Sequence, residues 1–181
     1  MNGGLIPNRY AKALYKFALD QGTDKAVYEE MKSVVAAFQA NPELNRVLAN
    51  PFVSNEDKKK LLIAAAGPQV ENGYRGFVRL ILDHRREEYA YQMALAYRDI
   101  YREANGISMV TVTTAVALPA AEMEKLHALV QKSFPKRTLE YTDTVDADII
   151  GGFIITVDSV RMDASISNEL EQLRLTLLSS K

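Results

Sequence analysis

The sequence predicts an α+β protein in which an N-terminal six-helix bundle is followed by a small C-terminal α/β domain. Two observations support this fold class. Up to Asn105 the apolar residues recur every three or four positions, which is the spacing of one face of a helix. After Gly106 the period falls to two in ISMVTVTTAVAL, a stretch rich in the valine and threonine that favour strands. We therefore expect two domains, residues 1–105 and residues 106–181.

The helices expected in the first domain are short and are separated by short breaks. The first begins near Pro7, because proline fits the first turn of a helix, and ends before Gly22. Asn41-Pro42 opens the third helix, and Ser54-Asn55-Glu56-Asp57 opens the fourth in capping-box style. Four of these helices have a clear apolar face. The residues of these faces are Ile6, Tyr10, Leu14 and Phe17 in the first helix; Val27, Met31, Val34, Val35 and Phe38 in the second; Phe77, Leu80 and Ile81 in the fifth; and Tyr89, Met93, Ala96 and Ile100 in the sixth.

The second domain combines strands with two amphipathic helices. Its expected elements are, in order, the alternating strand, a helix after Pro119, a strand at Thr138–Thr142, a hairpin of Ile149–Val157 and Val160–Met162 about Asp158-Ser159, and a final helix. We expect Asp163 or Ser165 to cap that last helix. Its apolar face carries Ile166, Leu170, Leu173 and Leu177, of which the first two are expected to pack on the sheet.

Composition excludes several classes of protein. The net charge of −1 argues against a nucleic-acid partner, because such proteins usually show a basic stripe. The absence of cysteine excludes thiolate catalysis and cysteine-ligated zinc sites. The longest uncharged run, residues 105–121, is too short and too polar to span a bilayer, so we expect no direct membrane insertion. The N-terminus also lacks the apolar core of a signal peptide.

Gly151-Gly152 is the strongest candidate for a phosphate-binding loop, and it fails as one. A P-loop places its glycines and a lysine between a strand and a helix, whereas these glycines precede a strand and no lysine follows. The three spaced glycines of a dinucleotide-binding loop are also missing. We expect a bulge or a close approach between two strands instead.

Other polar clusters also lack the partners that catalysis or metal binding requires. His84 and His127 lie far from any pattern for a metal site or a catalytic triad. The acidic group at Asp143, Asp146 and Asp148 lacks the glycine and glutamate of a calcium loop. Lys58-Lys59-Lys60 is expected to form a solvated helix face. We therefore expect no catalytic residue, no metal and no cofactor.

The first helix is the best candidate for an interaction surface. Arg9, Lys12 and Lys16 flank its apolar face, and Tyr10 and Phe17 are of the residue types that dominate interfaces. Periodicity alone favours core packing, because a core face and a docking face look the same in sequence. The residues thus indicate a binding or scaffold protein, with a generic helical adaptor as the alternative and a small phosphotransferase as a distant one.

Four segments carry a resemblance to a known family that covers nearly the whole chain. They are RYAKALYKFA, NPELNRVLANPFVSNEDKKKLL, GYRGFVRLILDHRREEY and IIGGFIITVDSVRMDASISNELEQLRLTL. In this order and spacing they resemble the delta subunit of bacterial F-type ATP synthases, the counterpart of the mitochondrial oligomycin sensitivity-conferring protein. The sequence departs from the family at Asp83-His84-Arg85-Arg86, where Glu-Asn-x-Arg is frequent, and at Ser167-Asn168, where a basic residue and glycine are frequent.

The resemblance implies a non-catalytic stator subunit that ties the catalytic head to the peripheral stalk, so that the head does not turn with the rotor. It implies that residues 1–105 bind the N-terminal helix of an alpha subunit and that residues 106–181 contact the b subunits. The protein would be monomeric within the complex and peripheral on the cytoplasmic side of the bacterial membrane.

The resemblance also implies which residues make these contacts. The groove for the alpha subunit would lie between the first and fifth helices, with Ala13 small enough for close helix approach. The candidate partner-binding residues are Tyr10, Ala13, Leu14, Phe17, Phe77, Leu80 and Ile81 in this groove and Leu173 and Leu177 on the last helix.

Overall fold

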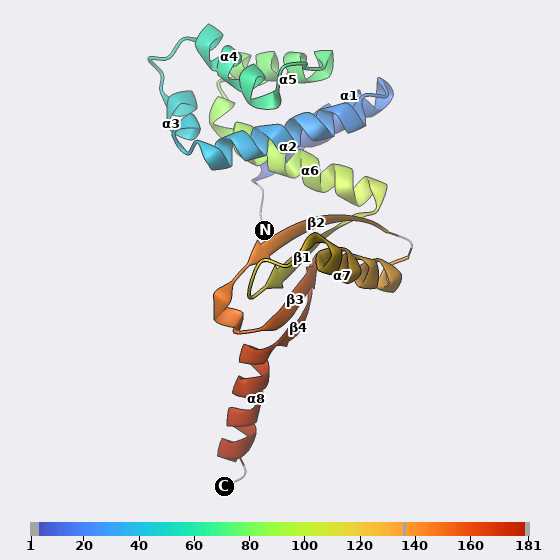
Figure 1. The fold of residues 1–181 in the computed structure, drawn as a ribbon. Helices are drawn as coiled ribbons and strands as arrows, with labels where there is room; N and C mark the ends of the chain where they lie inside the picture. Colours follow the sequence, from blue (N-terminus) through green and yellow to red (C-terminus); the bar gives the residue numbers. More distant parts are fainter. Residues whose placement is uncertain (1–3, 136, 180–181) are drawn as a thin grey trace. The chain divides into compact units, whose positions relative to one another are not determined.

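The computed structural model describes residues 4–135 and 137–179. Contacts between Cα atoms divide the chain into two compact units, residues 1–105 and residues 106–181. Over the described residues the protein is mostly helical and has one small four-stranded sheet (Figure 1). At this level the structure confirms the predicted fold class.

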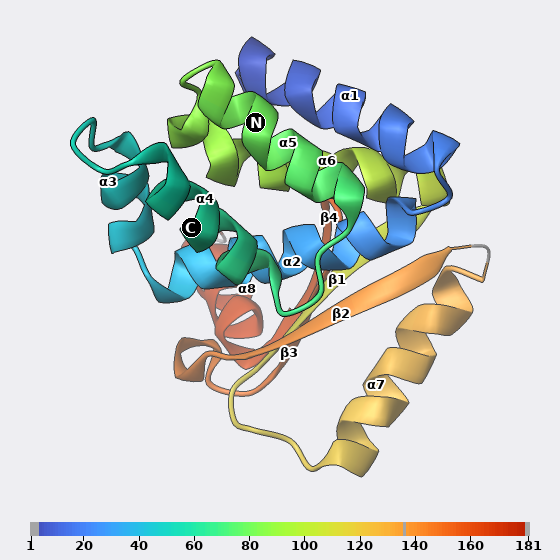
Figure 2. The same ribbon diagram turned by 90° about the horizontal axis from the view of Figure 1, so that it is seen from above.

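The first unit is helical throughout. Its elements are α1 (Leu5–Asp20), α2 (Asp24–Ala40), α3 (Glu43–Ala49), α4 (Asn55–Ala66), α5 (Asn72–Asp83), the 3-10 turn η1 (Glu87–Tyr89) and α6 (Ala90–Asn105). Helix α6 packs against α1 and α2, α2 also packs against α4, and α1 lies beside α5 (Figure 2).

The core of the first unit forms where α6 meets α1 and α2. The ring of Tyr28 on α2 stacks on Tyr101 of α6, with ring centroids 4.2 Å apart. Tyr97 on α6 is fully buried, and its hydroxyl donates a hydrogen bond of 3.1 Å to the backbone oxygen of Asp24. Each buried ring contributes roughly 1.5–3 kcal/mol through removal of apolar surface from water. These contacts fix α1 and α2 on the last helix of the unit.

Helix α4 begins as the sequence predicts. The backbone N–H of Asp57 donates to the Ser54 hydroxyl at 3.2 Å, and that hydroxyl donates in turn to the Asp57 carboxylate at 2.7 Å. The aspartate therefore faces the cap residue but does not reach the Ser54 backbone N–H, as the longer glutamate of a capping box would. A capping residue of this kind contributes about 1 kcal/mol to helix stability.

The expectation that Lys58-Lys59-Lys60 forms a solvated helix face is wrong for Lys58. Lys58 is only 4% exposed, and its ammonium donates to a Glu87 carboxylate oxygen at 2.6 Å. A buried ammonium is stable only when paired, and Glu87 supplies that pair from η1. The sequence shows no sign of this contact, because the two residues are 29 positions apart.

The second unit is a four-stranded sheet with two long helices. Its elements are β1 (Ile107–Thr114), α7 (Ala120–Ser133), β2 (Thr138–Val145), the 3-10 turn η2 (Ala147–Ile149), β3 (Gly152–Val157), β4 (Val160–Ser165) and α8 (Ile166–Ser179). The strand order is β2-β1-β3-β4, with β1 and β2 parallel and the other neighbours antiparallel. Helix α7 connects the two parallel strands, as a parallel pair requires.

The core of the second unit lies between this sheet and α7. It consists of Val110 and Val112 from β1, Val130 from α7, and Ile155 and Val157 from β3. The alternation of buried and less buried residues along β1 matches the period of two that predicts the strand. Burial is thus one-sided, as expected for a sheet covered by a helix on one face.

Gly151-Gly152 allows a close approach between strands, as the sequence predicts. Gly152 has φ +75°, and a Cβ there would collide with the backbone oxygen of Ala164 on β4. A Cβ at Gly151 would lie 2.7 Å from the Ile166 side chain. Only glycine therefore lets β3 begin this close to the end of β4.

The hairpin and the start of α8 also follow the sequence. Strands β3 and β4 pair around Asp158-Ser159, with Asp158 in the left-handed region at φ +50°. The Ser165 hydroxyl accepts from the backbone N–H of Asn168 at 3.2 Å and donates to Asp163 at 2.6 Å. Ser165 is therefore the cap and Asp163 orients it. The hydrogen bonds that the Asp163 carboxyl accepts from Ser165 and Arg161 lower its pKa.

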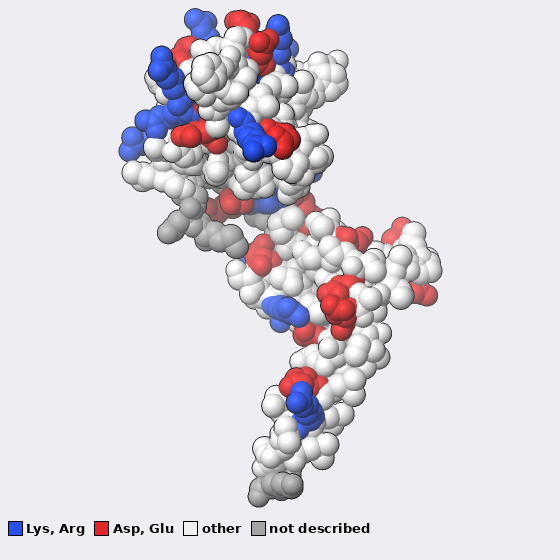
Figure 3. All heavy atoms as spheres, turned by 90° about the vertical axis from the view of Figure 1, so that its left-hand side faces the viewer, with Lys and Arg blue, Asp and Glu red and all other residues white. Residues whose placement is uncertain are grey.

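Helix α8 lies almost entirely in solvent. None of its described residues is buried, and Ile166 and Leu170 are 44% and 53% exposed. The expectation that Leu170 packs on the sheet is therefore wrong, while Ile166 keeps one contact at Gly151. In Figure 3 most atoms on the visible face of α8, at the lower end of the picture, belong to uncharged residues.

Candidate partner-binding groove

An apolar groove runs between α1 and α5. It encloses about 260 Å³. Its lining residues are Tyr10, Ala13, Leu14 and Phe17 from α1 and Asn72, Gly73, Gly76, Phe77 and Leu80 from α5. The structure thus brings together six of the seven residues that are assigned to this groove from the sequence.

Helix α1 has two adjacent apolar stripes, and only one of them belongs to the core. Ala11, Leu14 and Ala18 are buried, at a spacing of three and four. The groove stripe is shifted by one position, to Tyr10, Ala13 and Phe17, and Ala13 and Phe17 are exposed. A shift of one residue turns a helix position by about 100°, so the two stripes point in different directions.

Helix α5 also has one stripe of residues in the core and another that lines the groove. Its buried stripe includes Tyr74, Val78 and Ile81, while Gly73, Gly76 and Leu80 line the groove. The assignment of Ile81 to the groove is wrong, because its side chain is 0% exposed and lies in the core, where no partner can reach it. Leu80 and Ile81 are equally apolar in sequence, but they face different sides of the helix.

The floor of the groove on α5 is backbone, because two glycines stand there. A Cβ added to Gly76 would meet nothing within 4 Å, and one added to Gly73 would touch the Phe17 ring at 3.4 Å. Neither glycine is identified as a site residue from the sequence. Only Gly76 carries a signal in the sequence, since glycine in a helix interior costs up to about 1 kcal/mol and requires a compensating role.

The groove leaves large apolar side chains in contact with water. Phe17 is 51% exposed and Leu80 is 42% exposed. Covering such side chains is worth about 25 cal/mol per Å² of apolar surface. Adjacent exposed apolar residues around a hollow mark an interaction site more often than isolated ones do.

A second hollow continues the groove toward the start of α1. It is lined by Ile6, Arg9, Tyr10, Ala13, Leu80, His84 and Arg86, and it shares three of these residues with the first hollow. The Tyr10 hydroxyl and His84 Nδ1 share a hydrogen bond of 2.8 Å at this end. The groove is therefore apolar over most of its length and basic at one end.

The start of α5 is held by a buried carboxylate. Glu30 on α2 is 6% exposed and accepts a hydrogen bond from the backbone N–H of Glu71, the residue before α5. Burial raises the pKa of the Glu30 carboxyl, and the hydrogen bond from Glu71 opposes that rise. One wall of the groove is thus anchored to α2.

The other predicted partner residues lie in the second unit. Leu173 and Leu177 are 61% and 75% exposed on α8. They are therefore accessible to a partner.

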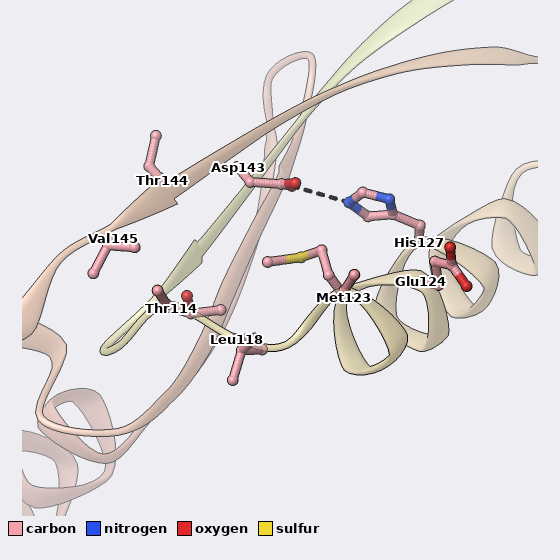
Figure 4. A pocket seen from close by; sticks show the side chains of 10 residues that line it. Thr114, Leu118, Met123, Glu124, His127, Asp143, Thr144 and Val145 are labelled. Atoms are coloured by element: carbon pink, nitrogen blue, oxygen red, sulfur yellow. Dashed lines mark hydrogen bonds and ion pairs between the residues drawn. The ribbon is translucent and has the colours of Figure 1, made fainter.

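The second unit also contains a hollow with a His–Asp pair, shown in Figure 4. His127 on α7 shares a hydrogen bond of 2.9 Å with Asp143 on β2, and its ring stacks on Tyr141 at 3.9 Å. The Tyr141 hydroxyl donates to the His127 backbone oxygen at 2.9 Å. These contacts fasten α7 to β2.

That hollow lacks the other groups of a catalytic site. Its hydroxyl groups are Thr114, which donates to the Val116 backbone oxygen, and Thr144, which is hydrogen-bonded to Thr113. Neither is hydrogen-bonded to His127, as an activated nucleophile would be. Within residues 4–135 and 137–179, no three histidine or carboxylate side chains gather to hold a metal ion.

Comparison with known proteins identifies the family of the chain. The family model described as ATP synthase delta (OSCP) subunit matches residues 6–177. The ATP synthase subunit delta of Parabacteroides distasonis is 37% identical over 181 residues, covering 100% of each chain. That of Phocaeicola vulgatus is 36% identical over 172 residues, covering 94% of this chain and 92% of the relative.

A solved structure shares the fold. A chain in the cryo-EM structure of the Toxoplasma gondii mitochondrial ATP synthase hexamer matches with a TM-score of 0.73 and 18% identity. The match covers 97% of this chain and 98% of that chain, so both units take part. The chain therefore belongs to the ATP synthase delta (OSCP) subunit family.

Proposed function

We propose that this protein braces the catalytic head of an ATP synthase by holding the N-terminal helix of an alpha subunit in the α1–α5 groove. The observation that carries the proposal is the groove itself, with Phe17 and Leu80 exposed above a glycine floor. An amphipathic helix placed there covers these side chains with its own apolar face.

Membership of the family makes the chain a structural subunit of the ATP synthase and not a catalytic one. A stator transmits torque only if its parts do not yield. In this proposal the six helices of residues 1–105 act as one bundle, because α6 packs on both α1 and α2. A bound helix that must persist under load requires a slow off-rate; nanomolar affinity corresponds to about −12 kcal/mol.

The second contact in this proposal is made by residues 106–181 with the b subunits of the peripheral stalk. Leu173 and Leu177 on α8 are the residues proposed to meet them. A helix with this much exposed leucine is most stable when another apolar helix covers it.

The protein is a peripheral, membrane-associated part of its complex. Among the described residues no helix has both the length and the apolar character needed to cross a bilayer. In this proposal one copy per complex lies on the cytoplasmic side, where its partners would carry it.

The groove is tested by calorimetric titration of the full chain with a peptide that copies the first two dozen or so residues of the same organism's alpha subunit. Saturable one-to-one binding is expected. Ala13→Asp should weaken it at least about a hundredfold, because a carboxylate would lose its water beneath the bound helix. Ala13 is exposed, so the variant should keep its fold, which circular dichroism checks.

The matched control is Lys16→Asp, which places the same side chain on α1 at an exposed position outside the groove. It should bind the peptide nearly as the parent does. If Ala13→Asp binds as tightly as this control, the alpha subunit docks elsewhere, and a generic adaptor role becomes the better explanation.

A further inference from the structure

The basic end of the groove contains two arginines from different segments of the first unit. Arg9 on α1 is exposed, and Arg86, after α5, is partly buried. Both line the hollow that continues the apolar groove. Over the part of the chain that the structure describes, neither guanidinium is in an ion pair, although the nearby Asp83 is paired with Arg79 at 3.8 Å and Glu87 with Lys58.

From this we infer that the groove selects a helix bearing an acidic side chain, which Arg9 and Arg86 bind together at one end. The inference rests on the proposed function and adds to it the charge pattern that the partner helix must have. Two guanidinium groups offer donors in planar forks that match a carboxylate. The apolar part of the groove gives affinity, and this end gives register.

The geometry also sets where the acidic residue must lie. At one end of the groove Phe17 lies where a Cβ on Gly73 would touch its ring, and at the other end Tyr10 and His84 are hydrogen-bonded. Phe17 lies seven positions after Tyr10 on α1, a rise of about 10 Å along the helix. A partner helix lying along the groove therefore needs its acidic residue about seven or eight positions from the apolar residue that sits over Gly73 and Gly76. That spacing keeps both on one helix face.

Tyr10 has a defined place in this arrangement. Its ring lines both hollows, while its hydroxyl is held by His84 at 2.8 Å. The ring separates the apolar part of the groove from the two arginines. A helix shifted by one turn, a rise of about 5.4 Å, would place its carboxylate against this ring and lose both guanidinium partners.

The experiment is a double-mutant cycle with the full chain and the alpha-subunit peptide described above. Each acidic residue of the peptide is changed singly to its amide and titrated against the parent, the double variant Arg9→Met with Arg86→Met, and the control Lys12→Met. Lys12 lies on α1, is exposed and lines neither hollow.

One peptide carboxylate, at the stated spacing, should account for most of the effect. Its loss and the double arginine variant should each weaken binding about five- to twentyfold, and combining them should add little. Lys12→Met should change affinity less than about twofold. Raising salt from roughly 0.05 M to 0.5 M should weaken binding to the parent more than to the double variant, because screening removes only the pair that is present.

The outcomes separate this inference from the proposed function. If the peptide binds the parent and the double arginine variant equally well, the acidic anchor is refuted while the groove still stands. If losses at a peptide carboxylate and at the arginines simply multiply, the two do not meet, and the inference fails in the same way. If the peptide does not bind the folded parent at all, the proposed function and this inference fall together.

Discussion

The α1–α5 groove and helix α8 both expose apolar side chains, but they do so with opposite shapes. The groove is concave, and the helices that form its walls are held by buried residues outside its lining, Ala11 and Ala18 on α1 and Val78 and Ile81 on α5. Helix α8 is convex and has no buried residue among those described. In the proposed function the first region is a preformed receptor for a helix. The second is itself a helix, which a partner in the peripheral stalk would cover.

This difference predicts that changes on α8 leave the fold intact and affect only its partner. Changing Leu173 and Leu177 together to Asp should weaken binding of peptides from the C-terminal ends of the b subunits at least about a hundredfold, since two apolar anchors are lost and two charges enter the interface. The free energy of unfolding should change by less than about 0.5 kcal/mol, because both side chains are exposed. Calorimetry with these peptides and denaturant titration measure the two effects.

Gln172→Asp is the matched control on the same helix. Gln172 is exposed and points away from the stripe of Leu170, Leu173 and Leu177, so its replacement should leave b binding nearly unchanged. A double leucine variant that binds b as tightly as this control would place the stalk contact elsewhere in residues 106–181.

The groove predicts the reverse behaviour, in which a stabilising change removes function. Gly76→Leu should raise the free energy of unfolding by up to about 1 kcal/mol, because leucine is the better helix former. It should also weaken alpha-peptide binding about tenfold to a hundredfold, since the new side chain enters open space in the groove.

Gly76→Ala separates these two effects. It brings most of the helix propensity but only one methyl group, and a Cβ at this position meets nothing within 4 Å. We expect Gly76→Ala to gain stability and keep most of its affinity. Equal affinities for the alanine and leucine variants would show that the partner does not lie over Gly76.

The smallest expected effect concerns Glu30, the buried carboxylate on α2 that holds the start of α5. Because burial raises the pKa of Glu30 above its ordinary value of 4.5, the folded state binds that proton more tightly than the unfolded chain does. Ionised Glu30 therefore lowers stability at neutral pH, and the loss disappears as the pH falls toward 4.5. Glu30→Gln should be more stable than the parent at pH 7, and the difference should shrink toward pH 4.

Denaturant titration at several pH values measures this difference. Glu29→Gln is the control, because Glu29 is the neighbouring glutamate on α2 and is exposed. A difference for Glu30→Gln that stays constant from about pH 4 to pH 7 would contradict the assignment of the penalty to its ionisation.

Much of the fold follows from local patterns in the sequence. The period of two in residues 107–114, the cap at Ser54 and the turn at Asp158-Ser159 each depend on residues within a few positions, and the structure has each of them. The pairing of Lys58 with Glu87 could not be predicted, because it joins residues 29 positions apart. The exposure of Leu170 could not be predicted either, since a leucine stripe has the same spacing whether a sheet or a partner covers it.

The candidate site shows the same division. Tyr10, Ala13 and Phe17 are identified through a family resemblance, while apolar spacing alone favours the core for this helix face. Ile81 is misassigned because adjacent apolar residues on α5 face different sides, and only the packed structure distinguishes them. The role of Gly73 and Gly76 depends on what a side chain would meet in space, and no sequence period carries that information.

The position of α6 has a consequence for the order in which the complex assembles. Because α6 is the last helix of its unit and packs on both α1 and α2, a nascent chain cannot complete the α1 wall until residue 105 has left the ribosome. The α1–α5 groove is thus completed late, although its first wall is synthesised first. In the proposed function, an alpha subunit would therefore meet only copies of this unit whose last helix has already been synthesised.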